Sequence, residues 1–99
     1  MKAPEKCAAI EDVREAIDEL DREVLTLLGR RARYVEAATR FKTNPDSVRA
    51  PQRQKAMFAQ RRRWAEEVNL DPNFVEALYK EIVSHFVARE MDRWHTHQP

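Results

Sequence analysis

Residues 10–42 of this chain read IEDVREAIDELDREVLTLLGRRARYVEAATRFK. Apolar side chains recur in this stretch at alternating steps of three and four, at Ile10, Val13, Ile17, Leu20, Val24, Leu27, Tyr34, Ala38 and Phe41. This spacing predicts one apolar face along a helix of roughly thirty residues. We therefore expect a helix that begins at Ile10 and ends at Phe41 or Lys42.

Arg31 occupies the one position of this apolar seam, between Leu27 and Tyr34, where a cation replaces an apolar side chain. A buried charge without a counter-charge is costly. We therefore expect an anionic group to meet Arg31. A structural salt bridge between subunits is the alternative to a bound ligand.

The composition favours an all-α fold. The 99 residues include one Gly and five Pro, and helix-forming residue types are abundant. The length allows one domain, residues 1–99, and a domain of this size buries only about 60 to 65% of its unfolded surface. Three helices in one copy cannot enclose so long a seam, so we expect a homodimer.

Charge and hydropathy limit the classes of partner that the protein could bind. Eighteen Lys and Arg nearly balance seventeen Asp and Glu, so net charge gives no general attraction to nucleic acid or to an anionic membrane. No segment has the length and apolarity of a membrane span or a signal peptide, which predicts a cytoplasmic protein. The single Cys and the scattered His predict neither an internal disulfide nor a metal site.

The second half of the chain predicts two further helices. Residues 43–50 have turn chemistry and no period, so we expect a loop there that could act as a lid. Pro51 suits the first position of a helix that ends near Val68 or Asn69. Asp71 and Pro72 form a start signal for the next helix. The tail, residues 95–99, is predicted to be disordered.

The last helix carries a second polar intrusion. Its apolar stripe reads Val75, Leu78, Ile82 and Phe86, and the next step of four lands on Glu90. Glu90 is therefore expected where the core continues, unless the helix turns away and exposes it.

Two antiparallel copies of the first helix would bring three cations together. Arg31 and Lys42 are separated by about 16 Å along one helix, and the partner's Arg14 would be carried toward the space between them. Such a pocket suits a small dicarboxylate. The chain shows no nucleophile–base pair, metal cluster or glycine-rich phosphate loop, so catalysis would rest on positioning and fixed charges. A unimolecular rearrangement or an elimination is the type of reaction that positioning and fixed charges alone can catalyse.

Several runs of residues resemble the all-helical chorismate mutase family, and within it the isochorismate pyruvate lyase branch of salicylate and siderophore biosynthesis. The similarity covers nearly the whole chain. The runs are Val13-Arg14-Glu15-Ala16-Ile17-Asp18, Leu28-Gly29-Arg30-Arg31, Tyr34-Val35, Ala37-Ala38, Arg40-Phe41-Lys42, Ala50-Pro51, Arg63-Trp64-Ala65-Glu66-Glu67 and Phe74-Val75-Glu76.

The resemblance implies the chorismate mutase type II fold, an intertwined homodimer of three-helix chains with two active sites. It implies that Arg14 binds a substrate carboxylate across the subunit boundary and Arg31 binds one within the chain. Lys42 would hold a carboxylate and the breaking ether oxygen. The implied activity is elimination of pyruvate from isochorismate to give salicylate by a concerted hydrogen shift, with chorismate mutase side activity and no cofactor.

Two positions depart from the lyase pattern. Glu90 stands where the lyases resemble one another in carrying Gln, and it must be protonated to donate a hydrogen bond to the ether oxygen. We therefore expect activity to fall as pH rises through neutrality and Glu90→Gln to flatten that profile. Ala50 and Gln54 replace the helix carboxylate typical of the mutases, which favours the lyase branch. Gln54 also differs from the apolar lyase residue, so mutase side activity is expected.

The sequence thus predicts catalytic roles for Lys42 and Glu90. The predicted substrate-binding residues are Arg14, Arg31, Arg53, Gln54 and Phe86. One alternative function is a dedicated chorismate mutase of aromatic amino-acid synthesis. Another is a non-catalytic helical dimer that binds anionic partners, such as nucleic acid, through Arg49, Arg53 and Arg61 to Arg63.

Overall fold

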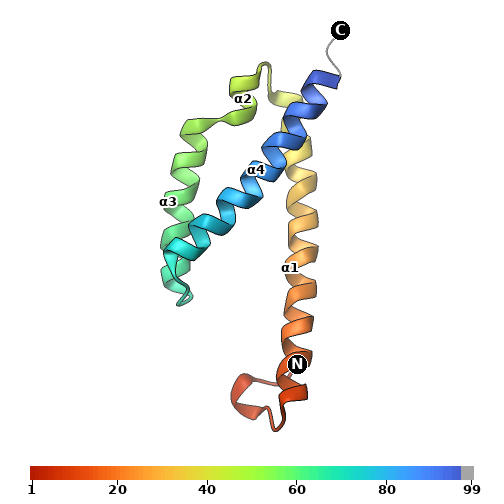
Figure 1. The fold of residues 1–99 in the computed structure, drawn as a ribbon, viewed down its shortest axis with the longest axis vertical. Helices are drawn as coiled ribbons and strands as arrows, with labels where there is room; N and C mark the ends of the chain where they lie inside the picture. The colour runs from red at the N-terminus through yellow and green to blue at the C-terminus, as the bar shows by residue number, and fades with distance from the viewer. Residues whose placement is uncertain (97–99) are drawn as a thin grey trace. The chain divides into compact units, whose positions relative to one another are not determined.

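The structure is a computed structural model that describes residues 1–96. These residues form helices and no strand, which confirms the predicted all-α class. In chain order the elements are η1 (Pro4–Lys6), α1 (Ile10–Ala38), η2 (Thr39–Phe41), α2 (Pro45–Arg49), α3 (Pro51–Glu67) and α4 (Pro72–Thr96) (Figure 1). They divide into two compact units, Met1–Val35 and Glu36–Pro99. No helix within residues 1–96 combines the length and apolarity that crossing a bilayer requires.

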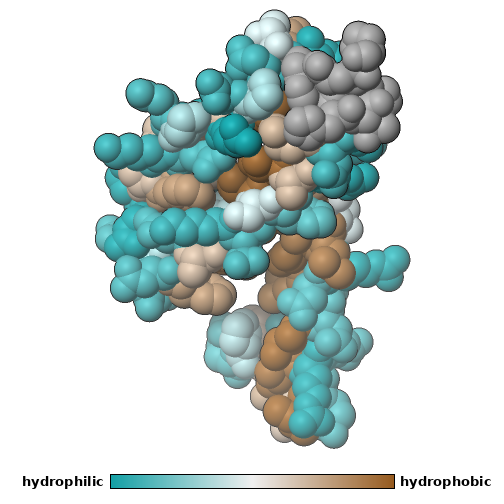
Figure 2. All heavy atoms as spheres, turned by 45° about the horizontal axis from the view of Figure 1, so that its top comes forward, coloured by the Kyte–Doolittle hydropathy of each residue, from teal (hydrophilic) through white to brown (hydrophobic). Residues whose placement is uncertain are grey.

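The first unit contains the N-terminal segment and most of α1. The predicted apolar seam is present on α1, yet none of the residues of this helix is buried. Ile17, Leu20 and Val24 keep 50%, 46% and 53% of their surfaces exposed. Figure 2 shows apolar side chains along this helix. A single chain therefore leaves the seam uncovered.

The end of α1 differs from the sequence expectation. The α-helix ends at Ala38, and Thr39–Phe41 continue as one turn of 3₁₀-helix. The hydroxyl of Thr39 donates a hydrogen bond of 2.6 Å to the carbonyl of Glu36. A side chain thus hydrogen-bonds a backbone carbonyl in the last turn of the helix. Tightening into a 3₁₀ turn is a common way for a helix to end. Lys42 consequently lies outside the helix, on extended backbone.

The predicted loop 43–50 contains a short helix, α2, which sequence analysis missed. Asn44 caps it by accepting a hydrogen bond of 2.9 Å from the backbone N–H of Ser47, and Pro45 occupies its first turn. Val48 is only 4% exposed, and α2 packs against α4. Burying a Val side chain contributes about 1.5 to 3 kcal/mol. This contact accounts for a helix too short to persist by itself.

Helices α3 and α4 form an antiparallel hairpin, the main packing contact of the second unit (Figure 1). Its core contains Met57 and Ala65 from α3 and Val75 from α4. Helix α3 begins at Pro51 as predicted and ends at Glu67, one residue before the predicted end. The carboxylate of Asp71 accepts a hydrogen bond of 2.9 Å from the backbone N–H of Asn73, which confirms Asp71 as the cap of α4.

Helix α4 extends through Thr96. The prediction that the tail is disordered from His95 onward is therefore wrong for residues 95 and 96, because the helix continues through them. The rest of that prediction concerns residues 97–99, which lie outside the described residues.

The basic run 61–63 also belongs to the hairpin. The guanidinium of Arg61 lies 4.6 Å from the ring centroid of Trp64 and 5.5 Å from that of Tyr79, so it stacks between α3 and α4. Arg62 Nη1 donates to the side-chain oxygen of Asn73 at 3.0 Å and lies 3.6 Å from the carboxylate of Glu76. Two of the three arginines are thus held in contacts within the protein.

Candidate active site

Lys42 and Glu90 meet in the second unit. The ammonium nitrogen of Lys42 donates to Oε2 of Glu90 at 3.1 Å, and the two side chains are 22% and 8% exposed. The pair joins residues 48 positions apart in the chain. Because both groups are largely removed from water, their attraction is stronger than that of a surface pair, and each would be costly to leave alone.

Local structure explains how each member of this pair is placed. Glu90 continues the apolar stripe of α4, one turn beyond the half-buried Phe86, and is itself 7% exposed. The alternative that α4 exposes Glu90 to solvent is therefore wrong. Lys42 follows the turn η2 with extended backbone angles (φ −100°, ψ 132°), which ends helical winding before the side chain leaves the backbone. A buried carboxylate and a nearly buried ammonium thus stand together at the end of an apolar face.

A second ion pair connects the same two segments. Nη1 of Arg93 lies 2.6 Å from Oε1 of Glu36, near the end of α1. The hydrogen bond from Arg93, together with its charge and that of Arg89, lowers the pKa of Glu36 below the ordinary value of 4.5. Glu36 is therefore ionised at neutral pH. Sequence analysis missed this pair. The sequence indicated only that the opposite charges of Glu90 and Arg93, three residues apart, share one face of a helix.

The other predicted site residues are distributed over both units. Arg14 and Arg31 both lie on α1, Arg14 exposed and Arg31 half-buried. Seventeen residues of helix separate them, which is about 25 Å along the axis. They cannot therefore bind one small molecule within a single copy of this helix.

Three predicted residues lie on α3 and α4. Arg53 is exposed on the first turn of α3. The side-chain amide of Gln54, on the same turn, donates a hydrogen bond to the carbonyl of Arg49 and so ties α3 to the end of α2. Phe86 is half-buried, and its ring meets that of His85 edge to face at 5.0 Å. Phe86 thus lies on the stripe that leads to Glu90, where a pocket wall was predicted.

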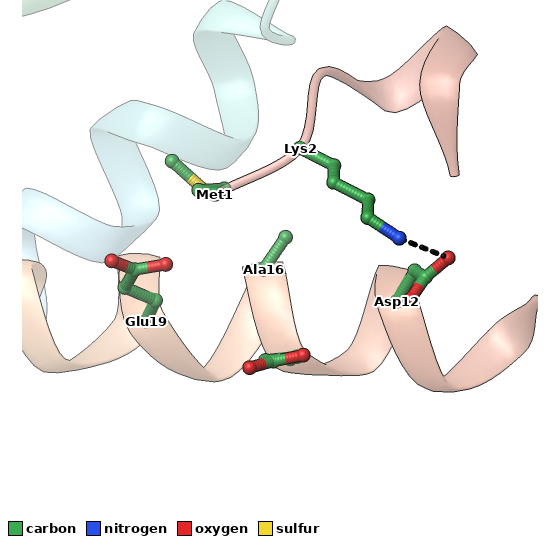
Figure 3. Close-up of a pocket in the computed structure, with 6 residues that line it drawn as sticks. Met1, Lys2, Asp12, Ala16 and Glu19 are labelled. Atoms are coloured by element: carbon green, nitrogen blue, oxygen red, sulfur yellow. Dashed lines mark hydrogen bonds and ion pairs between the residues drawn. The ribbon is translucent and has the colours of Figure 1, made fainter. Parts of the chain in front are cut away.

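A shallow pocket lies elsewhere, in the first unit. It encloses about 200 Å³ and is lined by Met1, Lys2, Asp12, Glu15, Ala16 and Glu19 (Figure 3). An ion pair of 3.3 Å between Lys2 and Asp12 lies at one end of it. Three of its six lining residues are acidic, so it does not suit an anionic substrate. It contains none of the predicted site residues.

Within the described part of the chain, no group of three or more His, Cys, Asp or Glu side chains is arranged to hold a metal ion. The chemistry available at the Lys42–Glu90 pair is that of a fixed cation and a carboxyl group. An ammonium held there can stabilise negative charge that develops on an oxygen atom.

Comparison with known proteins identifies the class to which this chain belongs. Residues 13–91 match the chorismate mutase type II family, and the chain belongs to that family. Among curated relatives, the isochorismate pyruvate lyase of Pseudomonas aeruginosa is 46% identical over 94 residues, which cover 95% of this chain and 93% of the relative. The resemblance noted from the sequence is confirmed.

Proposed function

We propose that this protein is an isochorismate pyruvate lyase that forms salicylate and pyruvate, with chorismate mutase activity as a side reaction. The observation that carries the proposal is the 46% identity, over nearly the full length of both chains, to a relative with that name. The buried Lys42–Glu90 pair supplies a chemical basis for it.

Lys42 acts on the oxygen from which the carbon–oxygen bond breaks. In the concerted elimination, negative charge accumulates on the ether oxygen as a hydrogen shifts to the departing enolpyruvyl group. A fixed ammonium at that atom stabilises the transition state more than the ground state, and only such differential stabilisation accelerates the reaction. Phe86, one turn from Glu90, walls the pocket, and Glu90 holds the ammonium of Lys42 in place.

The substrate carboxylates bind to arginines from two subunits of a homodimer. Arg31 binds one within the chain, and the partner's Arg14 binds the other. The exposed seam of α1 supports this assembly, because its large apolar side chains from Ile10 to Leu27 each remain more than a third exposed. The separation of Arg14 from Arg31 on one helix supports it as well. In this assembly residues 1–99 form one chorismate mutase-like helical domain with intertwined partners, and Arg53 and Gln54 border the pocket.

A dedicated chorismate mutase is the second candidate, and membership of the chorismate mutase type II family favours it. Gln54 is the residue on α3 that could bind a substrate hydroxyl. Because its amide already donates to the carbonyl of Arg49, that contact would have to break first. We therefore place the mutase reaction second.

The test supplies each substrate separately to the purified protein. Salicylate fluorescence follows isochorismate conversion, and absorbance follows loss of chorismate. We expect salicylate from isochorismate and slower formation of prephenate from chorismate. Lys42→Ala, purified in the same way, controls for contaminating host enzymes. Chorismate conversion without any salicylate would replace the lyase assignment by the mutase, and no conversion of either substrate would refute both.

A further inference from the structure

The two ion pairs that join residues 36–42 to α4 have opposite polarity. The segment that closes α1 presents an acid at Glu36 and a base at Lys42, whereas α4 presents an acid at Glu90 and a base at Arg93. Glu36 meets Arg93 and Lys42 meets Glu90, so the two segments pair in antiparallel order. Any arrangement that exchanged the partners would set acid against acid and base against base.

Arg93 is also a close neighbour of Glu90. Residues three apart on a helix share a face, with Cβ atoms about 5 to 6 Å apart. A guanidinium can bind a carboxylate with two parallel hydrogen bonds, which an ammonium cannot do. Arg93 is therefore a strong competitor of Lys42 for Glu90. The contact of 2.6 Å with Glu36 directs its guanidinium to another carboxylate.

Glu36 is well suited to hold Arg93. It is ionised at neutral pH, because Arg93 and Arg89 lower its pKa. Its own segment leads within six residues to Lys42, so the two contacts are made by one short stretch of chain. The side chains of Glu36 and Arg93 are 59% and 41% exposed, so the pair lies at the protein surface. A surface pair contributes little to stability.

We propose that Glu36 is a positioning residue for the reaction described under Proposed function, on which this inference rests. By engaging Arg93, Glu36 keeps this arginine away from Glu90 and leaves the Glu90 carboxylate to anchor Lys42. When Glu36 loses its charge, Arg93 binds Glu90, and the ammonium of Lys42 loses the contact that fixes its position.

The proposal predicts an asymmetry between two variants that break the same ion pair. Glu36→Gln releases Arg93, and we expect kcat for salicylate formation to fall about tenfold with KM changed less than about threefold, because a displaced catalytic group affects the chemical step. Arg93→Gln removes the competitor, and we expect kcat within about threefold of the unmodified protein. The double variant should resemble Arg93→Gln, so that removal of Arg93 rescues the loss of Glu36.

Glu76→Gln is the matched control. It removes another ion-paired carboxylate, one that contacts Arg62 and Lys80 at the other end of the hairpin, and it should leave kcat unchanged. Equal losses in Glu36→Gln, Arg93→Gln and the double variant would show an ordinary structural ion pair and overturn the proposal. An unchanged kcat in Glu36→Gln would overturn it too.

A second readout does not need turnover. The NMR resonance of the Glu90 carboxyl carbon should shift in Glu36→Gln, return toward its original position in the double variant, and stay in place in Glu76→Gln. A protein that converts neither substrate yet shows this pattern would refute the proposed function while confirming the competition for Glu90. A Glu90 resonance that does not shift in Glu36→Gln would overturn the proposal even in an active enzyme.

Discussion

The ammonium of Lys42 lies 3.1 Å from the carboxylate of Glu90, a residue that is only 7% exposed. The two residues come from the turn after α1 and from the last third of α4, and their contact closes one end of the second unit. An anionic substrate that enters here meets the ammonium of Lys42 beside its counter-charge, Glu90. The pair therefore influences both substrate affinity and the chemical step.

Replacement of Lys42 by Ala should lower kcat for salicylate formation by about 100-fold or more, by analogy with loss of a preorganised donor. It should also lower the free energy of unfolding by about 1 to 3 kcal/mol, because the Glu90 carboxylate then lacks its counter-charge. Steady-state kinetics and urea unfolding measure the two effects. Lys80→Ala removes an ion-paired lysine of α4 that is 60% exposed, and it should change neither quantity appreciably. A Lys42→Ala enzyme with normal kcat would contradict the role given to this ammonium.

Replacement of Glu90 by Gln should lower kcat for salicylate formation, because the amide lacks the charge that anchors the ammonium of Lys42. The neutral amide retains hydrogen-bonding capacity toward the ether oxygen, so kcat should stay within about tenfold of the unmodified protein. The same variant tests the expectation drawn from the sequence that activity falls with rising pH and that Gln removes this dependence. Parallel pH profiles for the two proteins would contradict that expectation.

Replacement of Leu20 by Glu should disrupt the proposed dimer. A carboxylate on the apolar seam of α1 cannot be buried against a second copy without a large cost. Sedimentation equilibrium should show a shift to monomer, and salicylate formation should fall with it because the partner's Arg14 is lost. Arg22→Glu places the same carboxylate two residues away, about 160° around the helix, and should remain dimeric. A fully active monomer in either protein would exclude cross-subunit sites.

The stability of the first unit should depend on pH through Asp12. A hydrogen bond from the backbone N–H of Ala8, followed by one from Lys2, lowers the pKa of Asp12 below its ordinary value of 3.8. A carboxyl whose pKa is lower in the folded than in the unfolded chain stabilises the fold above the unfolded pKa, and this contribution is lost as pH falls through the folded pKa. Asp12→Asn should therefore melt at a lower temperature than the unmodified protein at neutral pH, and the difference should vanish in strong acid. A difference that persists there would have another cause. Asp21→Asn, at an exposed position of α1, is the control.

Replacement of Ala50 by Gly should stabilise the protein. Ala50 joins α2 to α3 with φ 41° and ψ 60°, a left-handed conformation that costs an L-residue with a Cβ roughly 1 kcal/mol relative to Gly. The expected gain is about 0.5 to 1 kcal/mol in the free energy of unfolding. Ala56→Gly makes the same chemical change at an exposed position within α3 and should cost about 1 kcal/mol. Chemical denaturation of the two variants should therefore give shifts of opposite sign.

The sequence predicted the elements that depend on local signals. The period of apolar residues defined α1, and Pro51 and the Asp71-Pro72 pair marked the starts of α3 and α4. The start signal of α2 was of the same kind, with Asn44 before Pro45. Sequence analysis missed α2 because five residues are too few to show a helical period. The contact that stabilises α2 is the burial of Val48, and it depends on α4, which is distant in the sequence.

The candidate site was predictable to a similar degree. Glu90 was visible as a polar residue in step with an apolar stripe. Lys42 was placed in the predicted pocket by its spacing from Arg31, and its role came from the resemblance to a known family. The pairing of Glu36 with Arg93 was not predicted, because neither residue interrupts an apolar pattern and the charges at 90 and 93 indicate only a shared face of one helix. The roles of Arg14, Arg31, Arg53, Gln54 and Phe86 stay predictions that the kinetic variants can test.

The uncovered seam of α1 has a consequence for synthesis of the protein. It lies in the N-terminal half of the chain, so it leaves the ribosome before α3 and α4. In a chain that assembles as proposed, the seam then stays exposed to water until a second copy binds. The lifetime of the new chain therefore depends on the concentration of other copies. At low concentration the chains dimerise slowly, so chaperones and proteases bind a larger share of the newly made chains.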